Sequence, residues 1–292
     1  MLAPTTIASA PPRPGPDSVA WRIHRERIML LSWGRAILLQ FAHPLVAAGV
    51  AEHSAFGDDP RANRDRLHRT VQAMLDLIFG TPAQVASAAS RINAIHDRVR
   101  GYLREPTGAL PAHTPYSAHM PELLLWVHAT FVDSALVVYE RYVGALTPAE
   151  RDQYCAESRA IGPWLGIPVE TMPASHAELR AYMDRMEASG QIAVGPTALR
   201  LMRLLLRARP ALLVRGPLLT WLHLPTVGLL PPRLRAAYGL AWPRSHALLL
   251  ALTSGLCRRL LPLAPPALRY WPIARRAAAR WRAEEGGHAP GR

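Results

Sequence analysis

Four short motifs that begin α-helices recur along the chain and constrain its fold more than any other feature. They are Asp59-Pro60, Thr81-Pro82-Ala83-Gln84, Thr147-Pro148-Ala149-Glu150 and Ser175-His176-Ala177-Glu178. In each motif a polar side chain precedes the first helical turn, where it can accept hydrogen bonds from free N–H groups. Three of the motifs also place proline at the first helical position, where its missing N–H does no harm. No convincing segment alternates apolar and polar residues as a half-buried strand does, so the sequence predicts an all-α fold.

The same start signals, together with the 3.6-residue period of apolar residues, give the expected helices. We expect helices at about 18–40, 44–54, 60–79, 82–103, 119–143, 148–161 and 176–188, then Arg/Leu-rich helices near 197–208, 233–240, 244–261 and 266–283. Gly80, Gly101 and Gly144 stand where helices are expected to end. Residues 105–117 are expected to form a long irregular loop, and such loops often border functional sites.

The composition excludes several kinds of protein. All 34 basic residues are arginine, so no lysine can form a Schiff base. Cys155 and Cys257 are too few and too far apart for a disulfide framework or a zinc site, which favours a reducing, cytoplasmic location. The Pro-rich residues 1–19 lack a continuous apolar run, so we expect a disordered leader rather than a signal peptide. No apolar run reaches the roughly 18 residues expected of a membrane span.

Positive charge is concentrated in the last third of the chain. Residues 191–292 carry 16 arginines against two glutamates, whereas residues 1–190 carry 18 arginines against 19 acidic residues. Such a segment can lie on an anionic membrane surface or bind a polyanion, or it can simply be a helical face solvated by arginine. Because no helix-turn-helix or zinc signature accompanies the charge, we do not expect a nucleic-acid partner.

Common catalytic motifs are absent from the sequence. It contains no GxGxxG, GxxxxGK[ST], HExxH or GxSxG. A ferritin-like di-iron site needs two Glu-x-x-His motifs on separate helices, and only Glu285-Gly-Gly-His288 has that spacing. The remaining candidates are histidines on the predicted helices, and axial histidine ligation makes a haem site plausible.

His96 stands at an apolar position of the predicted helix 82–103. Val85, Ile92 and Val99 recur every seven residues, and His96 belongs to the neighbouring row between Ala89 and Leu103. We therefore expect its side chain to point into the core. A buried imidazole needs a hydrogen-bond partner, a metal or a cofactor iron.

Other residues in the first half are candidates for the same site. His43, His53 and His128 lie on predicted helices, and each is either a hydrogen-bonded core histidine or a ligand. Arg66 and Thr70 share one face of the predicted helix 60–79, with Arg69 beside them. These three residues can hold a water, dioxygen or a carboxylate, or they can form a solvated face.

Several segments, taken in order, resemble one known family. They are HPLVAAGVAEHS (43–54), RLHRT (66–70), FGT (79–81), IHDRVRG (95–101), YSAHMPELLLWVHATFVDS (116–134) and YERYVGALTPAERDQYCAES (139–158). Together they resemble the catalytic domain shared by the fungal ER-bound oxygenase MpaB and the bacterial latex-clearing rubber oxygenases. The resemblance covers roughly 20–240 and implies an all-α single domain with a globin-like core and one b-type haem.

The resemblance also implies roles for individual residues. Arg66 and Thr70 match an Arg-x-x-x-Thr pair beside the haem, and His96 is the following histidine, which implies that it ligates the iron. Arg69 stands where the rubber oxygenases can carry a distal lysine, and since arginine stays protonated, we expect an open or water-filled distal side. Glu52 corresponds to a pocket glutamate that acts as a base.

The resulting hypothesis is a haem-b-dependent oxygenase that acts with dioxygen on a small apolar substrate. Arg66, Thr70 and Glu52 would be catalytic, and His43 and His128 would complete the cofactor pocket with His96. Residues 20–240 would form the catalytic domain, and the basic helices of 241–292 would pack on it or extend it, with peripheral contact to a membrane as an option. One alternative is a non-catalytic helical haem- or lipid-binding protein at membrane surfaces. Another is a family member that has lost haem, in which His96 is a structural residue.

Overall fold

The computed structural model describes residues 13–54, 60–207 and 217–286, including all of their side chains except those of 60–67, 207, 217–222 and 285–286. The α-helices are α1 (Val19–His24), α2 (Leu30–Phe41), α3 (Pro44–His53), α4 (Pro60–Phe79), α5 (Pro82–His96), α6 (Pro121–Tyr142), α7 (Pro148–Ser158), α8 (Gly162–Leu165), α9 (His176–Ala188), α10 (Pro196–Arg207), α11 (Pro217–Gly228), α12 (Pro232–Ala237), α13 (Arg244–Leu260), α14 (Pro266–Arg269) and α15 (Pro272–Gly286). The described residues contain one sheet, made of β1 (Arg100–Tyr102) and β2 (Pro115–Ser117). The all-α prediction is therefore confirmed, whereas the globin-like arrangement of the core stays a prediction.

The helix-starting motifs act as the sequence predicts. Thr81 and Thr147 each form a reciprocal capping box with the residue three positions later, and Ser175 accepts a hydrogen bond from the Glu178 N–H. These caps satisfy N–H groups that a helix start otherwise leaves without partners. Asp59 lies outside the described residues.

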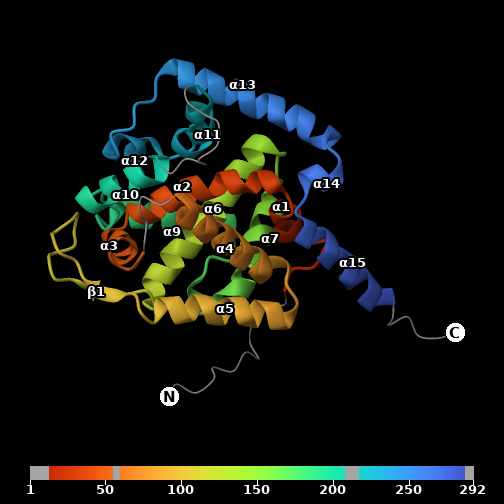
Figure 1. The fold of residues 1–292 in the computed structure, drawn as a ribbon, viewed down its shortest axis with the longest axis horizontal. Helices are drawn as coiled ribbons and strands as arrows, with labels where there is room; N and C mark the ends of the chain where they lie inside the picture. Colours follow the sequence, from red (N-terminus) through yellow and green to blue (C-terminus); the bar gives the residue numbers. More distant parts are fainter. Residues whose placement is uncertain (1–12, 55–59, 208–216, 287–292) are drawn as a thin grey trace.

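The core is built on the pair α2 and α6, which cross in the middle of the molecule (Figure 1). α6 is long and apolar enough to cross a membrane by length and composition, but 67% of its most apolar window is buried inside the fold. Trp126, Ala129 and Val138 are fully buried on it. We therefore describe α6 as the central core helix of this fold.

A buried ion pair joins the two central helices. Arg35 of α2 and Asp133 of α6 lie 2.7 Å apart, and both side chains are 4% exposed. The Arg35 guanidinium also donates to the Ser134 hydroxyl and to the Leu229 carbonyl, each at 2.7 Å. Because a buried charge needs both a counter-charge and hydrogen bonds, this arrangement fixes how α2, α6 and the segment after α11 meet.

The predicted helix 82–103 is wrong in its last turns. α5 ends at His96, and Gly101 of β1 pairs with Tyr116 of β2 in an antiparallel register. A Cβ atom at Gly101 would lie 2.6 Å from the Tyr116 hydroxyl, so this close pairing requires glycine. Part of the expected loop 105–117 is therefore a strand, and Leu103 is buried from an extended segment rather than from a helix.

The C-terminal helices lie against several earlier elements. In Figure 1 α13 runs along one edge of the fold, where it contacts α6 and α11, and α15 lies against α4 at another edge. Arg269 donates hydrogen bonds to both carboxylate oxygens of Glu26, from Nε at 2.8 and 2.9 Å and from Nη2 at 2.6 Å, and thus ties this segment to the residues that follow α1. Residues 1–12 of the expected leader lie outside the described residues, and Gly15 is close to the Trp281 ring. The boundaries 1–19, 20–240 and 241–292 stay predictions.

Candidate functional site

α4 and α5 form an antiparallel helical hairpin that carries most of the candidate cofactor residues. Leu77 of α4 packs against Val85, Ala88 and Ala89 of α5. Since the hairpin is antiparallel and turns at residues 80–81, the first turns of α4 lie at the same end as His96. The start of α4 and the last turn of α5, from which the site was predicted, therefore lie at the same end of the hairpin.

Arg69 and Thr70, on the third turn of α4, do not face the interior of the fold. Arg69 and Thr70 are exposed, because the buried face of α4 is formed by Leu75, Leu77 and Phe79. The Arg66 side chain lies outside the described residues. The approach of the Arg66 side chain to His96 therefore stays a prediction.

His96 is half-buried at the last position of α5, beside an exposed Ile95. It is less enclosed than the apolar period predicted, because the helix ends there. Its ring lies edge-on to the His119 ring at a centroid distance of 5.8 Å, and His119 Nε2 is 2.8 Å from Asp97 Oδ1. The Nδ1 atom of His96 is buried and has no hydrogen-bond partner among the described residues. Desolvation is the main cause that lowers the pKa of His96, and the neighbouring His119 lowers it further, so the neutral imidazole is favoured.

Glu52 occupies a hydrogen-bonded cluster where α3 meets the two strands. It accepts a hydrogen bond from the Tyr116 hydroxyl at 2.5 Å and another from Arg104 Nε at 2.7 Å. His53 Nε2 lies 3.2 Å from the Arg100 carbonyl oxygen and completes the contact with β1. The hydrogen bond from Tyr116 is the main cause that lowers the pKa of Glu52, and the contacts with Arg104 lower it further. Burial is the main cause that raises the pKa of Tyr116, and the neighbouring Glu52 raises it further. Glu52 is thus a carboxylate at neutral pH with a donor on each oxygen.

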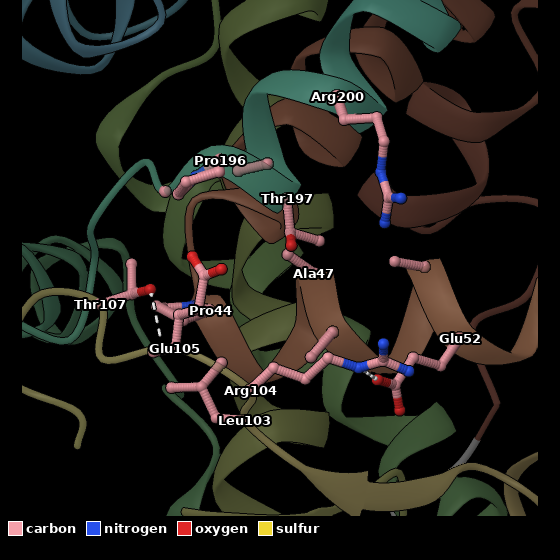
Figure 2. Close-up of a pocket in the computed structure, with 14 residues that line it drawn as sticks. Pro44, Ala47, Glu52, Leu103, Arg104, Glu105, Thr107, Pro196, Thr197 and Arg200 are labelled. Carbon is pink, nitrogen blue, oxygen red and sulfur yellow. Dashed lines mark hydrogen bonds and ion pairs between the residues drawn. The ribbon is translucent and has the colours of Figure 1, made fainter. Parts of the chain in front are cut away.

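A cavity of about 600 Å³ lies beside this cluster, between α3, the strand region and α10 (Figure 2). Its lining residues are Pro44, Ala47, Ala48, Ala51, Glu52, Leu103, Arg104, Glu105, Thr107, Gly195, Pro196, Thr197, Ala198 and Arg200. The small side chains of α3 form one wall. Figure 2 shows Arg200 of α10 reaching toward the end of the cavity where Arg104 and Glu52 pair. The volume falls within the range of roughly 300–1,000 Å³ typical of small-molecule sites.

A second, smaller cavity of about 100 Å³ lies inside the fold and contains His128. His24 and Tyr154 also line it, and the His24 Nε2 and Tyr154 hydroxyl atoms lie 3.0 Å apart. His128 Nε2 lies 3.5 Å from the Ser158 hydroxyl. Burial lowers the pKa of both histidines to about 4, so both rings are neutral. No motif singled out His24 in the sequence, because its helix was expected to continue through it.

His43 is a core residue at the start of α3. It is 2% exposed, and its Nδ1 atom has no partner among the described residues. Burial lowers its pKa to about 4, although a hydrogen bond with the Gln191 side chain opposes this shift. His43 lines neither of the two cavities, but the next residue, Pro44, lines the larger one.

The candidate residues thus fall into separate places. Glu52 lies at the larger cavity, His128 at the smaller one, His43 in the core, and His96 at the end of the α4–α5 hairpin. The loop from Asp97 to Gly101 connects His96 directly to the Glu52 cluster. Among the described residues, no group of three or more His, Cys, Asp or Glu side chains has the arrangement of a metal site.

Comparison with known proteins identifies the class of this helical domain. The family described as ER-bound oxygenase mpaB/B′ and rubber oxygenase, catalytic domain, matches residues 21–260. The chain belongs to this family of oxygenase catalytic domains. The match extends 20 residues beyond the predicted limit at 240 and includes α13. No curated protein and no solved structure matches the chain.

Proposed function

We propose that this oxygenase-family chain depends on haem b and uses dioxygen to oxidise a small apolar substrate, with His96 as the iron ligand. The observation that carries the proposal is the buried, unpartnered Nδ1 atom of a neutral His96. A buried polar atom without a partner calls for an explanation. An unprotonated imidazole nitrogen has a free lone pair and is a good iron ligand. The donor chemistry of His96 therefore fits a haem.

The residues of α4 would complete the cofactor site. Arg66, Arg69 and Thr70 would donate hydrogen bonds that orient dioxygen or a haem propionate. The haem, when bound, supplies an iron centre able to activate dioxygen for addition to an alkene or another activated carbon. The sequence has no lysine, and arginine stays protonated, so neither residue type would ligate the iron.

The larger cavity is the candidate substrate pocket. Its alanine-rich wall on α3 suits an apolar substrate, and its charged end contains Glu52, Arg104 and Arg200. Glu52 is ionised and is placed to hold a proton, but it would have to exchange the Tyr116 or Arg104 hydrogen bond to do so. We therefore propose Glu52 as the acid–base group of the pocket and His43 and His128 as supporting core histidines.

An absorption spectrum of the purified protein tests the proposal directly. After expression with added haem, we expect a Soret band that shifts when the sample is reduced with dithionite. His96→Ala should lose most of this band, whereas His113→Asn should keep it, since His113 is exposed and asparagine tolerates its φ of 63°. The absence of a Soret band in the parent protein would contradict haem dependence, and full haem occupancy in His96→Ala would move the ligand elsewhere.

A non-catalytic lipid- or haem-binding protein is the second candidate. The observation that favours it is a set of exposed leucines on α13 within the basic last third of the chain. Vesicle binding without dioxygen uptake would support this candidate over the oxygenase. A folded, haem-free protein with intact His96–His119 packing would instead indicate a member that has lost haem.

A further inference from the structure

α13 carries a row of exposed leucines along its outer side. Leu248, Leu252, Leu256 and Leu260 follow one another at four-residue intervals and are 52–61% exposed. The following segment adds Leu263 at 79% and Leu268 at 70%. We call these six residues the leucine face. Residues four apart lie on one side of a helix, so the first four form a continuous apolar stripe.

The inner side of α13 is already occupied by the fold. Leu250 and Ser254 are 5% and 2% exposed, and α13 contacts α6 and α11. Figure 1 shows α13 on the outer edge, with the rest of the chain to one side of it. The leucine face is therefore additional to what the core requires. A contiguous exposed apolar patch of this kind marks an interaction surface.

Arginines flank the leucine face, and the segment of chain that forms this face contains no carboxylate. Arg244 lies four residues before Leu248, and Arg259 lies three residues after Leu256, so both project from the same side of the helix. Both are exposed, as are Arg275 and Arg276. The chain has no Asp or Glu from residue 188 to residue 283. The surface is thus both apolar and cationic.

We propose that the leucine face docks on an anionic lipid membrane, with α13 lying in the plane of the interface. Leucines would enter the boundary between headgroups and acyl chains, and the arginines would contact lipid phosphates. A second copy of this chain docked through the same segment fits poorly, because it would place the arginines of one α13 segment against those of the other, and neither segment contains a carboxylate. This proposal depends neither on haem nor on catalysis.

The dimensions of α13 suit a helix that lies on a membrane. Its 17 residues span about 25 Å at 1.5 Å per residue, which is shorter than the roughly 30 Å hydrocarbon core. Its inner side is also held against α6 and α11. Partial insertion of one side is therefore the arrangement that this helix permits.

Co-sedimentation of the full chain with vesicles tests the proposal. We expect binding to phosphatidylcholine vesicles with roughly 30 mol% phosphatidylglycerol, and weaker binding to phosphatidylcholine alone. The triple variant Leu248→Ser/Leu252→Ser/Leu256→Ser should reduce binding to anionic vesicles by about tenfold or more. The matched control Ile95→Ser/Tyr102→Ser removes side chains that are 56% and 63% exposed at the α5–β1 end, and it should bind as the parent does.

A second pair of variants separates the charge from the apolar contact. Arg244→Gln/Arg259→Gln should weaken binding about tenfold or more at low salt and lower its salt dependence, since each surface arginine contributes on the order of fivefold. Arg98→Gln/Arg100→Gln is the control, because both residues are exposed and lie near β1. Circular dichroism should show unchanged helix content in all variants, because every replaced side chain is exposed.

Three results would overturn the proposal. One is the absence of binding to anionic vesicles by the folded parent chain. Another is equal binding by the triple leucine variant and the parent. The third is concentration-dependent dimerisation that the triple variant abolishes while vesicle binding is absent, which would assign the leucine face to a second copy of this chain.

Discussion

The Tyr116 hydroxyl donates a 2.5 Å hydrogen bond to Glu52 across Gly101, so one contact joins α3, β1 and β2. Tyr116 is buried, and Arg104 binds the other carboxylate oxygen. Glu52 and Tyr116 do not belong to the hairpin of α4 and α5, but both lie next to Gly101, in the segment that follows His96. The cluster therefore positions that loop as well as the wall of the larger cavity.

Tyr116→Phe removes this hydrogen bond while keeping the ring. Because hydrogen bonds to charged groups contribute more than neutral ones, we expect a loss of about 1–2 kcal/mol in the free energy of unfolding. Urea denaturation measures it, and Tyr102→Phe is the control, since Tyr102 is 63% exposed on the paired strand. A loss in Tyr116→Phe no greater than in the control would show that the Glu52 contact does not stabilise the fold.

The Glu52 cluster also predicts an acid-dependent loss of stability. The pKa of Glu52 is lowered in the fold, mainly by the Tyr116 hydrogen bond, from an ordinary value of 4.5. A lowered folded-state pKa gives stability that is present above the unfolded value and is lost as the pH falls through the folded value. Below about pH 4.5, the parent should therefore lose stability faster than Tyr116→Phe. Unfolding free energies measured at several pH values in this window provide the test, and identical slopes would contradict it.

His24, His43 and His128 predict a second pH dependence at higher pH. Burial lowers the pKa of His24, His43 and His128 to about 4 from 6.5. The unfolded chain then binds more protons than the fold between these values, so stability should fall as the pH drops from 6.5 toward 4. Proton NMR titration of the imidazoles measures each pKa, and His113 provides an exposed comparison. A pKa near 6.5 for all three would contradict the burial described here.

The Arg35–Asp133 pair predicts a large effect from removing one partner. Asp133→Asn leaves the buried guanidinium without its counter-charge, which should cost about 3–5 kcal/mol. Asp184→Asn is the control, because Asp184 is 67% exposed and pairs at the surface with Arg180, which also reaches Asp133 at 3.4 Å, and such a surface pair contributes about 0–1 kcal/mol. Arg35→Met/Asp133→Leu should recover much of the loss. Thermal or urea unfolding measures all three, and an equal loss in both single variants would contradict the prediction.

Two helical glycines predict changes of opposite sign. A Cβ atom at Gly34 would overlap the Thr226 side chain, where α2 and α11 meet, so Gly34→Ala should destabilise by about 1–3 kcal/mol. A Cβ at Gly255 of α13 meets nothing within 4 Å, so Gly255→Ala should stabilise the helix by about 0.5–1 kcal/mol. Comparison of the two unfolding curves tests whether α2 and α11 approach as closely as described.

The sequence predicted the helices where local chemistry determines them. The start of α5 follows from the capping box at Thr81, and the start of α7 from the box at Thr147, because these side chains satisfy the N–H groups of their own first turns. The end of α5 could not be predicted in this way. It depends on the pairing of Gly101 with Tyr116, a residue 15 positions later, and local periodicity carries no information about that partner.

The site was predicted in part for the same reason. Glu52 does border a cavity, as expected. Arg104, just after β1, and Arg200 of α10 line the same cavity, and Tyr116 of β2 binds Glu52, but no local sequence motif predicted these three residues. The spacing of Arg69 and Thr70 left a pocket or a solvated face open. Both side chains are exposed, because the buried face of α4 is determined by distant partners such as α15. The roles of Arg66 and His96 stay predictions.

The bond between Arg269 and Glu26 has a consequence for how the chain is made. Glu26 is 1% exposed, and its guanidinium partner lies 243 positions later. During synthesis this carboxylate therefore cannot gain its cationic partner until residue 269 has left the ribosome. A chain that stopped at residue 260, where the family match ends, would contain the matched domain and yet leave Glu26 without its cation. Glu26 is therefore made early in synthesis but reaches its final surroundings only when the segment around Arg269 packs against it.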